Sequence, residues 1–252
     1  MAINVNTVYQ TVLLILNKEQ RGYMTPQEFN NIGNQVQLEI FEKYFEDLNQ
    51  QIRVPQADTD YSDRVTNLDE KISIFKTFGN AIYDSTTTPL TPYFTLPITD
   101  GYGNTVNFYR LGTVMYNNEV ELQRLQRSDF SYIDKSQLTK PSKSWPVYLY
   151  ENNKLFVKPT DIISDIQIDF IKKPTDVIWG FNVGGLGQYL YNATPFNAST
   201  QPTGSVNFEM HSSEQTEVIL RILMYAGLII RDPQIIQAAA QQVQMDEINK
   251  KS

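Results

Sequence analysis

Apolar residues recur every three or four positions through the first 78 residues, a spacing that predicts amphipathic helices. The first stripe consists of Val5, Val8, Val12, Ile15 and Leu16. The second helix is expected to begin at Thr25-Pro26-Gln27-Glu28, a capping box with proline at the first helical position. A third helix is expected over 60–78, and its apolar positions, again three or four apart, are Tyr61, Val65, Leu68, Ile72 and Phe75.

The pattern changes to that of strands beyond Gly79. Residues 84–92 form a tract of Ser, Thr and Pro that ends helical structure. Short alternating runs then predict strands at 93–96, 106–111, 114–116, 119–125, 147–151, 155–158, 165–171 and 177–179. The clearest pair flanks Asn152-Asn153, a turn dipeptide that tolerates positive φ. These runs favour a small antiparallel sheet.

Residues 181–204 are rich in Gly, Asn, Thr and Pro with isolated aromatic residues. A loop of this length is uncommon in a compact domain unless it is functional or disordered. We expect either a segment that becomes ordered on assembly or a mobile loop without a partner. The glycines at 184, 185 and 187 lack the spacing of a phosphate-binding loop.

The sequence returns to a helical pattern after the only histidine, His211. Ser212 and Gln215 have capping-box spacing before an apolar run at 218–224, so His211 is expected just outside a helix N-cap. A further helix is expected over 234–250. As a general base, His211 would need a nucleophile and an orienting carboxylate, and Glu209 and Ser213 lack a recognisable catalytic spacing. A structural role at the helix entrance is the favoured interpretation.

Composition excludes several classes of protein. The 252 residues carry 28 acidic and 21 basic side chains, a formal charge of −7, which disfavours sequence-specific DNA binding. The absence of cysteine excludes disulfides, thiol catalysis and cysteine-bearing zinc sites. The apolar run at 12–16 is too short to cross a bilayer and no secretory signal pattern is found, so we expect an intracellular or virion protein without membrane contact.

Two groups of acidic residues are candidate chemical sites. The aspartates at 58–69 resemble a calcium loop only faintly, because Asp63 stands where that loop requires glycine. Glu119 and Glu121 would share one face of a strand, which a solvated strand face explains equally well. We therefore expect no enzymatic activity, no cofactor and no metal.

From about residue 104 onward the sequence resembles a known family. The similar features are the hairpin within 146–159, the strand 168–174 followed by Trp179, and the block 207–217 before the last helices. They resemble the head-to-tail adaptors and tail tubular proteins of phages, and in particular ring proteins of crAss-like phages, whose N-terminal helices are similar to residues 4–49.

The resemblance implies an α+β fold in which a helical bundle formed from both chain ends carries an inserted antiparallel β-rich domain. The implied parts are an N-terminal helical part at 1–90, a β-rich insert with its long loop at 91–207, and C-terminal helices at 208–252. It also implies a closed ring of about twelve copies in the virion neck, reached from the host cytoplasm during assembly. Its partners would be the portal protein, neighbouring tail rings, and genomic DNA that passes without sequence-specific binding.

Residues expected to contact neighbouring copies are the loop aromatics and apolar positions of the last helix. They are Tyr189, Tyr191, Phe196, Ile235, Ile236 and Val243. Two other hypotheses stay open: a receptor- or carbohydrate-binding tail module that stacks sugars on aromatic side chains, and a hydrolase that uses Glu119 or Glu121.

Overall fold

The fold rests on a set of helices whose ends are fixed by side-chain caps. The computed structural model describes residues 2–18, 24–53, 59–85, 92–230, 237 and 239–245. Helix α1, Val5–Lys18, is capped by Asn4, whose Oδ1 accepts hydrogen bonds from the N–H groups of Asn6 and Thr7. Helix α2, Pro26–Arg53, begins with the expected capping box. There Thr25 N donates to Glu28 Oε2 at 2.9 Å and Glu28 N donates to Thr25 Oγ1 at 3.3 Å.

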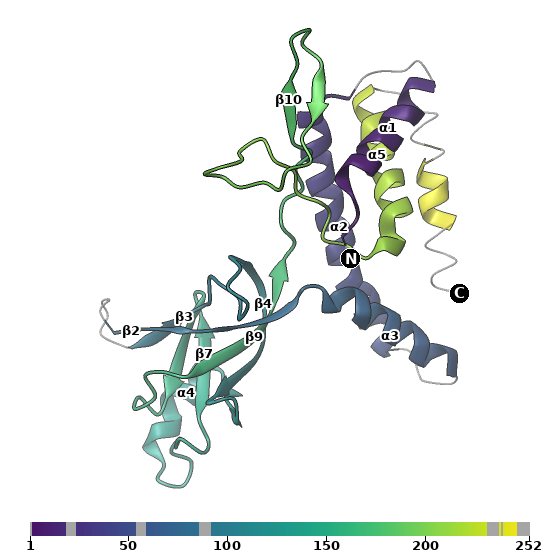
Figure 1. The fold of residues 1–252 in the computed structure, drawn as a ribbon. Helices are drawn as coiled ribbons and strands as arrows, with labels where there is room; N and C mark the ends of the chain where they lie inside the picture. Colours follow the sequence, from purple (N-terminus) through teal and green to yellow (C-terminus); the bar gives the residue numbers. More distant parts are fainter. Residues whose placement is uncertain are drawn as a thin grey trace. The chain divides into compact units, whose positions relative to one another are not determined.

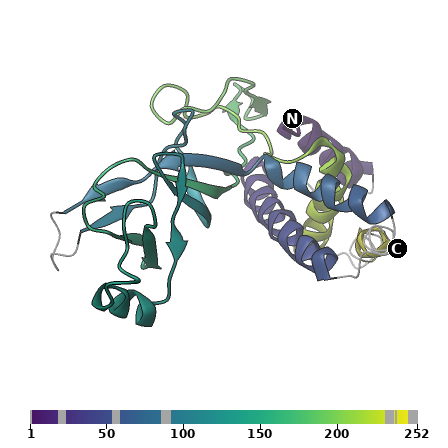
Figure 2. The same ribbon diagram turned by 90° about the horizontal axis from the view of Figure 1, so that it is seen from below.

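Apolar stripes join these helices to a third one. Helix α5, Gln215–Ile230, packs against α1 and α2, and the three lie side by side in both ribbon views (Figure 1, Figure 2). The apolar stripes of the three helices contain side chains that are almost fully buried, among them Val8, Val12, Leu16, Phe29, Val36, Ile40, Val218 and Ile222. Because each stripe repeats at helical spacing, one face of each helix enters this core.

Helix α3, Thr59–Ser73, is shorter than the sequence predicts. Residues 76–78, expected to be helical, belong to strand β1, Lys76–Asn80, which pairs with strand β9, Ile166–Lys173. The periodicity up to Phe75 is equally compatible with a helix, but sheet pairing with β9 decides the conformation of the next residues. The second C-terminal helix is described over 239–245, within the expected range 234–250.

The chain divides into two compact units. The helical unit comprises Met1–Ile74 and Pro174–Ser252, and the β unit comprises Phe75–Lys173. The boundaries thus differ from those expected at 91 and 207. Residues 75–85 belong with the strands, and 174–207, including the whole 181–204 segment, belong with the helices.

The β unit contains two sheets. One has the order β1-β9-β4-β5, with β4 at Asn107–Tyr116 and β5 at Val120–Glu121. The other has the order β2-β3-β8-β7-β6. Its strands are β2 Ile82–Asp84, β3 Tyr93–Thr95, β6 Gln123–Arg124, β7 Val147–Glu151 and β8 Lys154–Lys158. Pairing is antiparallel except between β6 and β7, which are parallel. An α+β fold is therefore observed.

Paired asparagines form two of the hairpin turns. The predicted turn between β7 and β8 is confirmed: Asn152 and Asn153 have φ values of 51° and 56°. Asn117 and Asn118, with φ values of 52° and 57°, make the corresponding turn between β4 and β5. Asparagine tolerates this left-handed region better than other non-glycine residues, which is why it suits these turns. The core between the strands is formed by Phe94, Val114, Leu122, Leu155, Ile166, Ile168 and Phe170.

Candidate functional site

His211 is itself the N-cap residue at the entrance to α5. The expectation that it lies just outside the cap was wrong. His211 precedes the 3-10 turn η2, Ser212–Glu214, and its Nδ1 accepts a hydrogen bond from Ser213 N at 3.3 Å. The same nitrogen lies 2.8 Å from Ser213 Oγ. The neighbouring Glu209 carboxylate accepts from the N–H of Thr175 at 3.0 Å. The contacts of His211 with Ser213 are those of a cap that satisfies a free N–H group of a helix start, whereas Glu209 binds the extended segment at Thr175.

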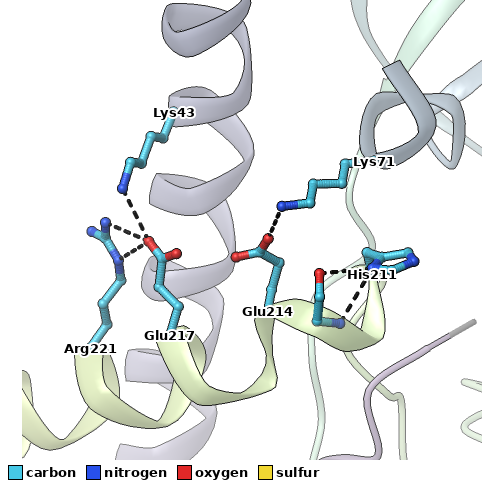
Figure 3. Close-up of polar contacts among 7 residues, drawn as sticks. Lys43, Lys71, His211, Glu214, Glu217 and Arg221 are labelled. Carbon is cyan, nitrogen blue, oxygen red and sulfur yellow. Dashed lines mark hydrogen bonds and ion pairs between the residues drawn. The ribbon is translucent and has the colours of Figure 1, made fainter. Parts of the chain in front are cut away.

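A buried ion cluster follows directly on this cap (Figure 3). Glu214 and Glu217 are 2% and 7% exposed, and charged groups are rarely buried so far without partners. Lys71 of α3 forms an ion pair with Glu214. Glu217 is held at 3.3 Å by Lys43 of α2 and at 2.9 Å by Arg221, one turn further along α5. The cluster therefore ties α2 and α3 to the start of α5.

The same carboxylates act on a buried tyrosine. Tyr44 is 4% exposed, and no described residue hydrogen-bonds to its hydroxyl. Burial first, and then the negative charges of Glu214 and Glu217, raise the pKa of Tyr44 far above its usual value. The phenol therefore stays neutral, and the ammonium of Lys71 lies 5.9 Å from the centre of its ring. The cluster combines opposite charges that compensate each other, which is the chemistry of an internal tie between helices.

A second polar array holds an extended segment against α2. Asn34 accepts from Val177 N and donates to Val177 O at 3.3 Å. Asn30 repeats this pattern on Trp179, accepting from its N–H at 2.7 Å and approaching its carbonyl at 3.5 Å. Gln37, itself 2% exposed, donates to Thr175 O at 2.8 Å. Spacings of four and three residues on a helix thus match every second residue of an extended chain. The side-chain amides of α2 thus make the backbone hydrogen bonds that a neighbouring strand would otherwise make.

Aromatic rings continue from this anchor into the 181–204 segment. Trp179 is 4% exposed and its Nε1 donates to Asn6 Oδ1 at 3.1 Å. Its ring centre lies 4.4 Å from that of Tyr9 on α1, 6.0 Å from Phe181 and 5.6 Å from Tyr191. Tyr189 meets the edge of Phe181 at 4.9 Å. We call these five residues the aromatic spine.

The 181–204 segment is an ordered arm, not an irregular loop. Strands β10, Phe181–Val183, and β11, Tyr189–Tyr191, form a hairpin that extends beyond the helices at the top of Figure 1. The following residues return beside Gly180, whose missing side chain matters because a Cβ there would lie 2.3 Å from the carbonyl oxygen of Gly204. Ser205 closes the base: its hydroxyl accepts from Gly180 N at 3.0 Å and donates to Asn192 O. A close backbone approach thus fixes the root of the arm.

The tip of the arm exposes apolar side chains. Leu186 is 94% exposed, Val183 65% and Leu190 50%. The expected contact residues fall in different places: Tyr189 and Phe196 are about 40% exposed, whereas Tyr191 stacks on Trp179 within the same chain. Val243 is partly exposed, and Ile235 and Ile236 lie outside the described residues. Tyr189 and Phe196 are therefore available to a partner, and Tyr191 supports the arm.

Sequence reasoning missed the amide array and the apolar tip. Asn30, Asn34 and Gln37 recur at helical spacing beside the apolar stripe, a pattern that could have indicated a polar partner for α2. The exposed leucines of the tip carry no such signal, because apolar residues in a Gly-rich hairpin do not reveal their exposure. Glu119 and Glu121, the candidate carboxylate pair, are both exposed beside the turn between β4 and β5.

No protein-family model matches this sequence, and no curated protein matches it either. Among residues 2–18, 24–53, 59–85 and 92–245, excluding the undescribed positions 231–236 and 238, no three His, Asp or Glu side chains are grouped as metal ligands would be. Within the part of the chain that the structure describes, no helix has the length and apolar character needed to cross a bilayer.

Proposed function

We propose that this protein is a structural component of a phage virion, one subunit of a ring in the neck that joins the portal to the tail. In this proposal the helices of both chain ends form one bundle that builds the ring, and the β unit is an insert. About twelve copies surround the channel through which the genome passes. The resemblance noted above for 104–217 motivates the assembly, and the geometry of the arm supports it.

The observation that carries the proposal is the construction of the arm. Its root is fixed by Trp179 and the amide array, while its tip presents Leu186 and Val183 at 94% and 65% exposure. Burying a leucine side chain contributes about 1.5–3 kcal/mol, so a rigid projection with an apolar end is suited to a site on another molecule. Heterologous contacts of this kind, repeated around an axis, close a ring.

The charge of the helical unit agrees with a conduit for DNA. That unit has 18 acidic and 10 basic side chains, whereas the β unit has 10 acidic and 11 basic. A channel lined by basic residues would bind phosphates through counterion release and retard the genome. An acidic helical unit would not bind the phosphates in this way, so the genome could pass through the channel.

Mass spectrometry of purified virions tests this function. We expect peptides of this protein in amounts equal to those of the portal protein. A matched pair of variants sharpens the test. Leu186→Asp at the tip should prevent incorporation into virions, whereas Ile163→Asp, which changes a 58% exposed apolar side chain of the β unit, should not. Absence of the wild-type protein from virions would refute the proposal.

A further inference from the structure

The chain between β6 and β7 presents the two most exposed aromatic and apolar side chains among the described residues of the β unit, Leu138 and Trp145. We call residues 124–146, from the last residue of β6 to the residue before β7, the basic segment; it contains helix α4, Arg127–Tyr132, and the 3-10 turn η1, Ile133–Lys135. Leu138 is 98% exposed, Trp145 81% and Tyr132 65%. Exposed tryptophan and tyrosine of this kind are enriched among residues that dominate binding energy at interfaces.

Hydrogen bonds hold this segment in a defined shape. Trp145 N donates to Ser142 O at 3.0 Å, which presents the indole on a tight turn directly before β7. Lys158 of β8 donates to the carbonyl of Phe130 at 2.8 Å and forms an ion pair with Asp134. The segment is therefore prepared for contact before any partner arrives, which lowers the entropic cost of binding.

The segment is basic in a protein that is acidic. It carries five basic residues, Arg124, Arg127, Lys135, Lys140 and Lys143, against the two acidic residues Asp129 and Asp134. The Asp134 carboxylate is already paired with Lys158 and the Arg127 guanidinium with Glu151, whereas Lys140 and Lys143 are both exposed. The segment thus presents net positive charge around its apolar side chains.

The helical unit offers the complementary charge. That unit has 18 acidic against 10 basic residues. On α2 the side chains of Glu42 and Glu46 are exposed and stand one helical turn apart, and Glu70 is exposed on α3. Opposite charges on two surfaces steer association and select the partner.

We propose that the basic segment docks on the acidic face of α2 and α3 in a second copy of this chain. The inference rests on the proposed ring and supplies one of its subunit contacts. Two different surfaces of one chain form this contact, so it is heterologous and propagates around a closed axis. Trp145 and Leu138 are its apolar anchors, and Lys140 and Lys143 face the carboxylates.

Photo-cross-linking tests the contact on the full-length chain. The photoreactive residue p-benzoylphenylalanine replaces Trp145 in one sample and the exposed Tyr102, outside the segment, in the control. Equal amounts of ¹⁴N and ¹⁵N protein are mixed and irradiated over a concentration series up to the solubility limit. We expect products from position 145 that join two copies through peptides containing Glu42 and Glu46. Products within one copy only, or no excess over the Tyr102 control, would overturn the proposal.

Charge reversal tests the same contact independently. Lys143→Glu should weaken self-association at least about tenfold, whereas Lys173→Glu, a change at another exposed lysine of the β unit, should not. Glu46→Lys should restore association to Lys143→Glu, and Glu119→Lys should not. Failure of that rescue would contradict the assigned partner surface.

Two outcomes separate this inference from its alternatives. If Lys143→Glu instead reduces binding to a duplex oligonucleotide and leaves self-association unchanged, the segment contacts nucleic acid and the proposal fails. A ring seen in virions without the 124–146 contact would overturn the docking and leave the proposed function standing. Cross-linked products that join two copies of a protein absent from virions would support the docking and overturn the proposed function.

Discussion

Replacing Asn34 with alanine should destabilise the helical unit because it removes the partners of both backbone polar groups of one buried residue, Val177. Asn34 accepts from the N–H of Val177 and donates to its carbonyl, and Val177 is 0% exposed. An unsatisfied buried backbone group costs about 1–3 kcal/mol. The higher helix propensity of alanine offsets about 0.5 kcal/mol of this loss of stability. Because Asn34 itself is half-buried and water can reach part of the site, we expect a net loss of about 2–3 kcal/mol.

Tryptophan fluorescence can follow this loss in the helical unit alone. The chain has two tryptophans, and the exposed Trp145 belongs to the β unit. In a Trp145→Phe background, urea unfolding is therefore reported by the buried Trp179, two residues from Val177. The linear dependence of the unfolding free energy on urea gives the change in stability.

A neighbouring glutamine provides the matched control. Gln35 is exposed and donates to Glu39 at 3.1 Å, so Gln35→Ala should change the unfolding free energy by less than about 0.5 kcal/mol. Asn34→Asp keeps an acceptor for the Val177 N–H but loses the donor for its carbonyl, so it should also destabilise. Equal stability of Asn34→Ala and Gln35→Ala would refute the reasoning, because the amide array would then contribute nothing.

Three further predictions concern the cluster, the α2 cap and the arm. Lys71→Met and Glu214→Gln, singly and together, should show a coupling free energy of about 1–3 kcal/mol in the same assay, and strictly additive losses would contradict the tie. Thr25→Ala should cost about 1 kcal/mol at neutral pH. Hydrogen bonds from the backbone N–H of Thr25 and then from its hydroxyl lower the pKa of Glu28. The part of the stability loss that is due to the Glu28 carboxylate should therefore be present above the unfolded pKa of Glu28 and vanish as pH falls through its folded pKa. Urea unfolding of Thr25→Ala and of the wild type, measured well above the unfolded pKa and well below the folded pKa of Glu28, tests this linkage. A destabilisation that is the same at both pH values would contradict it. Leu186→Asp should leave the unfolding free energy within about 0.5 kcal/mol and reduce self-association in sedimentation velocity; an unchanged sedimentation profile would count against the arm as a contact.

Local signals predicted the parts of the fold that depend on few residues. The capping box at Thr25 and Glu28 and the Asn152-Asn153 turn were both identified from short patterns, because each satisfies its own hydrogen bonds within four residues. Strand β7 was expected at 147–151 and is observed at Val147–Glu151. Such features need no knowledge of distant chain segments.

Long-range pairing accounts for what could not be predicted. Residues 76–78 form a strand because β9, some 90 positions later, supplies their partners. The 181–204 segment has the composition of an irregular loop, because its order depends on the contact of the Trp179 ring with Tyr9 and on the amides of α2. Neither contact leaves a trace in the composition of 181–204, so only the tertiary structure reveals the hairpin.

Cryo-electron microscopy of the virion neck tests the central claim most directly. The account predicts a closed ring on the channel axis, of about twelve copies, with the tip of the arm at Leu186 seated on a neighbouring subunit. Density for this protein in a peripheral spike, or in no ordered position on the axis, would contradict the proposed ring.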